Sequence, residues 1–139
     1  MGTEKKVLVV GTTPDYIDWI RTACPGSVVF LTDERARRNA SEPVPPPGEE
    51  LLCHLTEQET VLQLLQDFLL HWEIELEGIA CFDCEYLLLA SIVAAELGLA
   101  YPSSQAVENC RDKYKCKVLW QQKGVHCPDH RVIHSVEEA

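Results

Sequence analysis

The chain has 139 residues, of which 46% are hydrophobic and 24% are charged. This mixture excludes intrinsic disorder, collagen-like repeats and coiled coil as descriptions of the whole, and the length fits one domain of ordinary size. Twelve Lys and Arg residues against 22 Asp and Glu residues give a net charge of -10, so the protein repels polyanions and we expect no nucleic-acid partner.

The first segment of the chain predicts a strand, a helix and a second strand. Residues 7–10 form a continuous apolar run that Gly11 ends, which is typical of a strand covered on both faces. Asp15 is expected to cap a helix that Pro25 and Gly26 stop. The second apolar run, residues 28–31, follows at once, and this alternation favours a right-handed crossover in an α/β sheet.

The middle of the chain predicts a loop, a strand and an amphipathic helix. Beyond Asp33 the periodicity dissolves, and four of the eight prolines fall within five positions of a predicted surface loop, residues 41–48. Residues 51–55 are expected to form a third strand, and Thr56 with Glu59 fits a capping box for the next helix. Apolar residues then recur at helical spacing on one face of that helix: Val61, Leu64, Leu65, Phe68, Leu69 and Trp72.

The last third predicts one more buried strand and mostly helix after it. Residues 78–82 should form the fourth strand, which ends at Asp83. The stretch from Leu87 to Leu97 is apolar almost all round, so we expect a buried helix. Ser103 or Ser104 is expected to cap a short helix that runs through Asn109. A further helix is expected from about Arg111 to Lys123, and a fifth strand is expected to start at Val132 and Ile133.

We expect a cytoplasmic protein, because the apolar runs are too short for a membrane span or a signal peptide and the cysteines suit a reducing compartment. The longest apolar run, residues 87–95, is too short to cross a bilayer of roughly 30 Å as a helix, so no membrane partner is expected. Lys5 and Lys6 precede only four apolar residues, fewer than the roughly 7 to 15 of a signal-peptide core. Because the seven cysteines are odd in number and lie mostly in regular segments, we expect reduced, largely buried thiols.

The loop after the first strand has the position of a ligand-binding turn. Gly11 and Thr12 follow the carboxyl end of that strand, where ligands bind in open α/β sheets. A dinucleotide fingerprint needs three glycines and only the first is present, although Asp33 has the place of a ribose-binding acid. Three arginines beyond it could hold an anion, but such a cluster is more typical of a solvated turn: Arg35, Arg37 and Arg38.

The cysteines also allow a zinc or redox hypothesis. Cys81 and Cys84 form a C-x-x-C, and Cys127 with His130 forms a C-x-x-H, which together could supply four zinc ligands. Because Cys81 belongs to a predicted strand and Cys84 to the following helix, packed thiols are the favoured interpretation. Redox chemistry of the thioredoxin type would need both sulfurs at a helix N-terminus.

An ordered set of short motifs in the last third resembles the N-terminal region of ATP-grasp enzymes. A buried strand ends in Asp83, and a long helix closes with Leu-Gly-Leu at residues 97–99. A turn at Pro102 leads to the pair Asp112-Lys113, and the final helix ends in Gly-Val-x-x-Pro at residues 124–128. Each motif is common alone, and their order and spacing carry the resemblance.

The resemblance covers residues 78 to 134 and implies a fold and a domain organisation. We expect a three-layer Rossmann-like α/β sheet of four to five mostly parallel strands, with helices on both faces and a C-terminal helix leading toward an ATP-grasp lobe. Residues 1–109 would form the Rossmann-like pre-ATP-grasp domain. Residues 110–139 would form the linker helix and first strand of the ATP-grasp lobe.

The resemblance also implies roles for particular residues. Lys113 is at the Asp-Lys position and would reach the nucleotide phosphates together with Arg111. A lysine suits this task because it places a point charge near the triphosphate. Four residues would lie on the substrate side, at the mouth of the sheet: Gly11, Thr12, Asp83 and Glu85. No catalytic residue and no metal ligand is assigned to this chain.

The implied activity is that of a carboxylate–amine (or thiol) ligase, in which ATP phosphorylates a small-molecule carboxylate and a nucleophile attacks the acyl phosphate. A biotin-carboxylase-like and an amino-acid-ligase-like parent fit equally well. ATP and Mg²⁺ are implied for the full-length parent and neither is expected on this chain alone, because the family's second lysine, glycine-rich loop and Mg²⁺ ligands do not follow. The remaining lobes, in cis or in trans, and a second copy of the chain are the expected partners. The alternative is a stand-alone Rossmann-like module that binds a nucleotide or a partner without catalysis.

Overall fold

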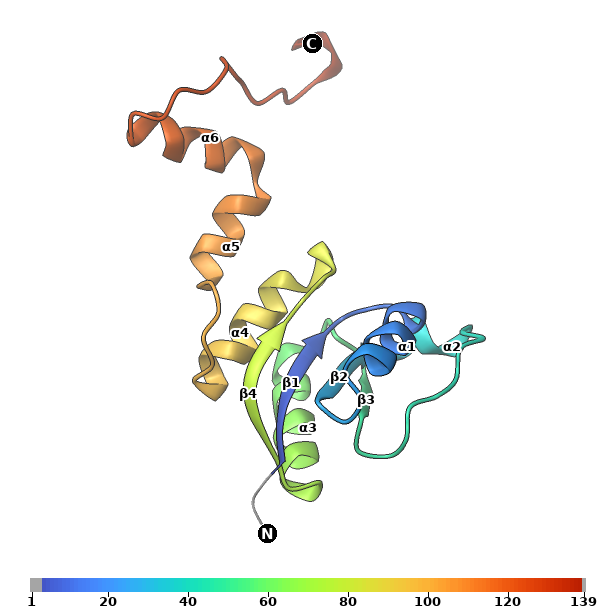
Figure 1. The fold of residues 1–139 in the computed structure, drawn as a ribbon. Coiled ribbons are helices and arrows are strands. Elements are labelled where there is room, and N and C mark those ends of the chain that lie inside the picture. Colours follow the sequence, from blue (N-terminus) through green and yellow to red (C-terminus); the bar gives the residue numbers. More distant parts are fainter. Residues whose placement is uncertain (1–3, 139) are drawn as a thin grey trace. The chain divides into compact units, whose positions relative to one another are not determined.

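The computed structural model describes residues 4–138, which divide into two compact units at Tyr101 and Pro102. The first unit contains a sheet and the helices that cover it (Figure 1). Its elements are β1 (Glu4–Val10), α1 (Pro14–Ala23), β2 (Val28–Asp33), α2 (Glu34–Arg38), β3 (Glu50–Cys53), α3 (Gln58–His71), β4 (Ile74–Ala80), the 3₁₀ turn η1 (Cys84–Tyr86) and α4 (Leu87–Leu97). The second unit contains α5 (Ser104–Arg111), α6 (Lys113–Gln122) and the 3₁₀ turn η2 (Val136–Glu138).

The four strands form one parallel sheet in the order β3-β2-β1-β4. The chain builds the sheet outward from β1 through β2 to β3, and then returns to the opposite edge of β1 with β4. The predicted Rossmann-like α/β fold is therefore confirmed. Because β1 is paired on both edges and covered on both faces, Leu8, Val9 and Val10 are all buried.

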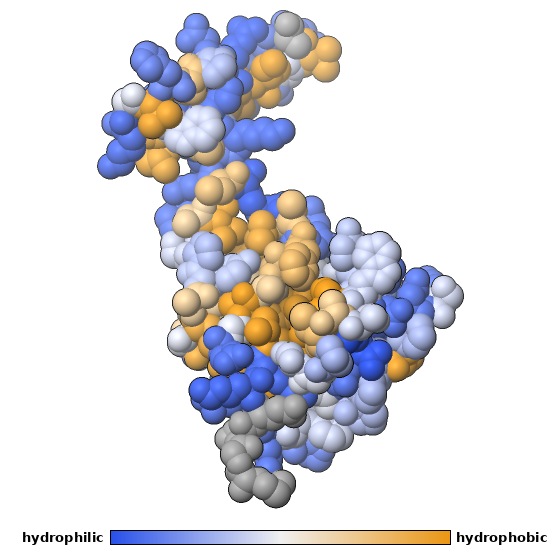
Figure 2. Space-filling view, viewed as in Figure 1, coloured by the Kyte–Doolittle hydropathy of each residue, from blue (hydrophilic) through white to orange (hydrophobic). Residues whose placement is uncertain are grey.

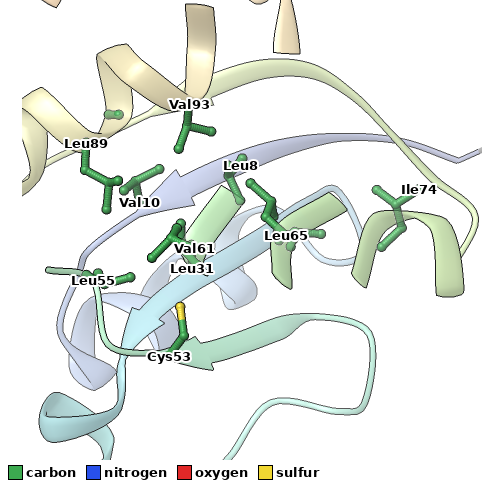
Figure 3. Close-up of a cluster of buried hydrophobic side chains, with 12 residues drawn as sticks. Leu8, Val10, Leu31, Cys53, Leu55, Val61, Leu65, Ile74, Leu89 and Val93 are labelled. Atoms are coloured by element: carbon green, nitrogen blue, oxygen red, sulfur yellow. The ribbon is translucent and has the colours of Figure 1, made fainter. Parts of the chain in front are cut away.

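Helices cover both faces of the sheet (Figure 1). On one face, Ile17 of α1 packs in a small cluster with Val9 and Phe30. On the other face, α3 and α4 contribute to the larger core, drawn in Figure 3. Its labelled members come from the strands, the helices and the loops between them: Leu8, Val10, Leu31, Cys53, Leu55, Val61, Leu65, Ile74, Leu89 and Val93. Alternate strand residues thus serve opposite layers, as the pleat requires.

The two helices of the larger core bear out their sequence patterns. Val61 and Leu65 of α3 are fully buried, whereas Leu64 is 39% exposed at the border of the apolar face. The helix α4 has the predicted bounds and ends at Gly98, which adopts the left-handed conformation at φ 67°. Hydrophobic residues also remain visible on the face of the first unit that Figure 2 shows, bordered by hydrophilic ones.

Two predictions about helix starts were wrong. The helix α3 begins at Gln58 after the cap residue Glu57, and no side chain caps it. The expected capping box at Thr56 does not form, because a turn in which the Glu57 amide donates to the His54 carbonyl comes first. Similarly, α1 is preceded by Thr13 as its cap residue, and Asp15 lies in its first turn.

Three predictions about other elements were also wrong. The fourth strand runs from Ile74 to Ala80, whereas a buried strand was expected over residues 78–82. It lies at the edge of the sheet and is mostly only partly buried, so a continuous apolar run does not mark its bounds. The short helix α2 lies where the periodicity dissolves, since the Asp33 side chain accepts a hydrogen bond from the Arg35 amide and caps it. Among residues 123–138, which the structure describes, Val132 and Ile133 are exposed and no strand forms.

The cysteines are less buried than expected. All seven are present as free thiols, but only Cys53 is buried. Cys24, Cys84 and Cys110 are exposed. Cys24 follows the end of α1 and Cys84 lies in a short turn, so neither faces the core.

The second unit consists of two capped helices and an extended tail. The Ser103 hydroxyl accepts a hydrogen bond from the Ala106 amide at the start of α5, as predicted. Asp112 caps α6 by accepting from the amides of Tyr114 and Lys115. The second compact unit begins at Pro102. The division into a Rossmann-like domain over residues 1–109 and the start of an ATP-grasp lobe over residues 110–139 stays a prediction. Within residues 4–138, no helix has the length and apolarity to cross a bilayer.

Neighbouring leucines of α3 provide a direct test of the core. Leu65→Ala should lower the free energy of unfolding by about 2–5 kcal/mol, because it leaves a cavity beneath the sheet. Leu64→Ala makes the same chemical change at a half-exposed position and should cost less than about 1 kcal/mol. Urea denaturation measures both variants, and equal losses would contradict the assignment of the buried face.

Candidate functional site

The candidate site lies at the carboxyl edge of the sheet, between β1 and β4. The chain direction reverses there: the connection after β1 leads toward β2, whereas β4 was added on the opposite side. Ligands of open α/β sheets bind in the crevice at such a switch point. A pocket of about 460 Å³ occupies this position. Six residues line it: Thr12, Thr13, Tyr16, Phe82, Asp83 and Cys84.

The structure brings Thr12 and Asp83 together, although 71 positions separate them in the chain. Thr12 follows β1 and is largely buried. Thr13 is the cap residue of α1, and its hydroxyl donates a hydrogen bond to the Asp15 carboxylate. Two of the four predicted substrate-side residues therefore line one pocket, and each lies just beyond the end of a strand.

Asp83 is held in place by the turn that follows it. Its Oδ1 accepts a hydrogen bond from the Glu85 amide at 3.0 Å, and its carbonyl accepts from the Tyr86 amide at 3.1 Å. Asp83 thereby caps the short turn η1. The cap engages one carboxylate oxygen, and Asp83 also lines the pocket. Glu85 lies in the same turn and is exposed.

Gly11 directly precedes the pocket residue Thr12, and the Tyr86 ring packs against it. Gly11 has φ +59°, and a Cβ atom on it would lie 2.1 Å from the Tyr86 ring. Its amide donates to the Leu31 carbonyl at 2.8 Å, which ties the turn to β2. A phosphate group cannot approach the Gly11 backbone closely while the ring is there. The glycine therefore permits close packing of an aromatic side chain, in the place where a dinucleotide fold would put pyrophosphate.

The Asp33 carboxylate is buried and engaged in hydrogen bonds within the fold, so it is not free to bind a ribose. Its carboxylate is 3% exposed and accepts hydrogen bonds from the Arg35 amide, the Arg35 Nε and Nη2 atoms and the Leu55 amide, at 2.9–3.3 Å. The hydrogen bonds from the Arg35 side chain outweigh burial and lower the pKa of Asp33 to about 2. Arg37 is also engaged within the fold, because its Nη2 atom forms an ion pair with the Glu50 carboxylate at 2.8 Å. Two of the three candidate anion-binding arginines thus belong to ion pairs.

The two residues predicted to contact nucleotide lie in the second unit. Arg111 is the last residue of α5, and Lys113 is the first residue of α6. The side chains of both residues are exposed. Their role toward ATP stays a prediction.

The prediction of packed thiols holds for one of the two cysteines of the C-x-x-C segment, because Cys81 is partly buried against the core whereas Cys84 is exposed. Burial raises the pKa of Cys81, and its thiol donates to the Asp83 carbonyl at 3.2 Å. A raised pKa disfavours thiolate chemistry, which depends on a lowered one. In the part of the chain that the structure describes, no three His, Cys, Asp or Glu residues are grouped so that they could hold a metal ion.

Sequence reasoning missed the two aromatic residues of the pocket, Tyr16 and Phe82. Phe82 was placed inside a buried strand, but β4 ends at Ala80 and the Phe82 ring is exposed. Their signal was positional, since each follows shortly after the carboxyl end of a strand at the switch point.

Comparisons with known proteins support the fold. No model of a protein family matches the chain, and no curated protein matches it in sequence. The structure is similar to that of an L-amino acid ligase from Bacillus licheniformis, with a TM-score of 0.71 and 17% sequence identity. The similarity covers 100% of this chain and 35% of the ligase chain. At this identity the likeness shows a shared fold, and the present chain spans about a third of the ligase.

The close packing of Tyr86 on Gly11 can be tested with a matched glycine. Gly11→Ala should destabilise the protein by more than about 2 kcal/mol, because the new methyl group meets the ring as well as a left-handed backbone. Gly26 has φ +76° and open space around it, so Gly26→Ala should cost only about 1 kcal/mol for the backbone. Thermal and urea unfolding of the two variants compares these costs. Equal destabilisation would show that the ring is not tightly packed there.

The Asp33 cluster predicts a dependence of stability on pH. The folded pKa of about 2 lies below the ordinary 3.8, so the charged carboxylate stabilises the fold above about pH 4 and this contribution is lost as the pH falls toward 2. The contribution amounts to about 2 kcal/mol. Asp33→Asn should lower the unfolding free energy at neutral pH by about this amount, and the gap from the wild type should narrow below pH 4. Parallel pH curves for the two proteins would contradict the assignment.

Proposed function

We propose that this chain is the substrate-side, N-terminal domain of an ATP-grasp ligase that joins a carboxylate to an amine. The observation that carries the proposal is the fold likeness to an L-amino acid ligase along the whole of this chain but over only 35% of that protein. The ordered motifs from Asp83 to Pro128 give further support, because their order and spacing resemble those of ATP-grasp enzymes.

The chemistry of the pocket suits a substrate better than a nucleotide. Its lining includes a carboxylate and two threonines but no lysine or arginine. Triphosphates need cations to neutralise them, and these would have to come from elsewhere. Lys113 and Arg111, together with the ATP-grasp lobes, are proposed to provide that charge. The pocket at Thr12 and Asp83 would then hold the substrate, with Glu85 at its mouth.

The proposed reaction converts the carboxylate into an acyl phosphate at the expense of ATP, and the amine then displaces the phosphate. Phosphoryl transfer depends on positioned cations and Mg²⁺. ATP-grasp lobes, in cis or in trans, would supply the metal ligands and the second lysine. The isolated chain should accordingly be catalytically silent.

Formation of ADP tests the proposal. The polypeptide that joins this domain to ATP-grasp lobes, or this chain mixed with separately encoded lobes, should form ADP only when a carboxylate and an amine are both present. This chain alone should form none. ADP formation that needs neither substrate would contradict the proposal. Failure of every combination to form ADP would instead favour a binding module without catalysis.

Substitution of Lys113 tests the proposed nucleotide contact. In the assembled ligase, Lys113→Ala should raise the Michaelis constant for ATP or abolish turnover, with a loss in kcat/KM of about tenfold or more, because a charge-assisted contact to phosphate disappears. Lys123→Ala removes the same charge beyond the far end of α6 and serves as the control. Unchanged ATP kinetics for Lys113→Ala would remove this residue from the site.

A further inference from the structure

Three exposed aromatic side chains lie beside the pocket. Trp19 is 66% exposed, Phe82 63% and Tyr16 49%. Tyr16 and Trp19 lie on α1, with ring centroids 5.5 Å apart and planes tilted by 59°. We call Tyr16, Trp19 and Phe82 the aromatic shelf. Contiguous exposed apolar patches often mark binding surfaces, whereas singly exposed apolar residues are ordinary.

The aromatic shelf lies next to the polar pocket. A second, almost wholly apolar hollow of about 270 Å³ is lined by Tyr16, Trp19, Ile20, Ala23 and Phe82. Tyr16 and Phe82 also line the pocket that contains Asp83. Because Tyr16 and Phe82 are walls of both hollows, the two hollows lie next to each other, and we treat them as one site. One end of this site is acidic and the other is apolar.

The charge of the site selects the sign of its ligand. Asp83 is the ionisable carboxylate in the lining, and no lysine or arginine lines either hollow. The net charge of the protein is -10, which adds to a field that attracts cations. Aromatic faces also attract ammonium groups through their quadrupoles. A phosphate or a free carboxylate would meet repulsion at the same place.

We propose that this site binds the ammonium group of a small amphipathic amine, with the ammonium at Asp83 and the apolar chain on the aromatic shelf. The identification of this amine as a ligase substrate rests on the proposed function. Binding itself is a property of the 139-residue chain and needs neither ATP nor further lobes. The shelf thereby determines specificity for the apolar part of the amine.

Three simple probes separate the two ends of the site. Isopentylamine carries an ammonium and an apolar chain, methylamine has the ammonium alone, and isocaproate has a similar chain with a carboxylate. Each is titrated into the ¹⁵N-labelled full chain at neutral pH while the amide resonances of Thr12, Thr13 and Asp83 are followed. We expect saturable shifts with isopentylamine, affinity at least about fivefold weaker with methylamine, and no saturable binding of isocaproate.

Matched variants test the two ends separately. Asp83→Asn keeps an oxygen to cap the Glu85 amide but removes the charge, so it should weaken isopentylamine binding by about tenfold. Asp67→Asn removes the same charge from the exposed side of α3 and should leave binding unchanged. Trp19→Ala and Phe82→Ala alter exposed rings and should reduce the affinity for isopentylamine toward that for methylamine. Trp120→Ala, a partly exposed tryptophan of the second unit, is their control.

Several results would overturn the proposed amine site, and others separate it from the proposed function. Absence of saturable isopentylamine binding, equal binding of isocaproate, or unchanged affinity in Asp83→Asn would overturn the proposal. It would also be overturned if sedimentation showed a concentration-dependent dimer that Trp19→Ala abolishes, because the shelf would then bind a second copy of the chain. Amine binding without any ligase activity would refute the proposed function and leave this site standing. Ligase activity without amine binding here would do the reverse.

Discussion

The double pairing of β1 is the constraint on which the rest of the structure depends. Parallel strands lie on both of its edges, and helices cover both of its faces, so its apolar run is surrounded on all sides. The chain enters the sheet at this strand, extends one way, and must return to the other edge. The carboxyl ends of β1 and β4 therefore lie side by side while the segments that follow them diverge. The pocket at Thr12 and Asp83 is a direct consequence of this topology.

Local packing then decides which chemistry the switch point can support. In a dinucleotide-binding fold the first turn is left open so that the backbone can approach a phosphate. Here the Tyr86 ring packs against Gly11 and closes that approach. The accessible surface is shifted outward, onto threonine hydroxyls, a carboxylate and aromatic rings. The same topology thus presents a different surface at the switch point, because the Tyr86 ring from the turn after β4 packs against this glycine.

The two acidic residues at this edge of the sheet also differ in their electrostatic surroundings. Asp33 and Asp83 both follow strands, but their surroundings differ. The Asp33 carboxylate is buried and neutralised by the Arg35 guanidinium, with the Leu55 amide as a further donor. Asp83 receives one amide at its cap and lines the pocket, and no lysine or arginine lines that pocket with it. The first carboxylate holds β2 to the loop after β3, and the second lines the pocket.

The amino-acid sequence by itself determined the layers of this protein and much of its order. Apolar β-branched runs specified β1 and β2, helical periodicity specified the buried face of α3, and Gly98 and Ser103 marked helix ends, because these signals depend on near neighbours in the chain. Only the tertiary structure decided that β4 is an edge strand that begins at Ile74, that Tyr86 covers Gly11, and that Tyr16 and Phe82 wall the pocket beside Asp83. Those facts depend on which strand lies beside β1 and on side chains that meet across some 70 positions, and no local pattern encodes such a contact.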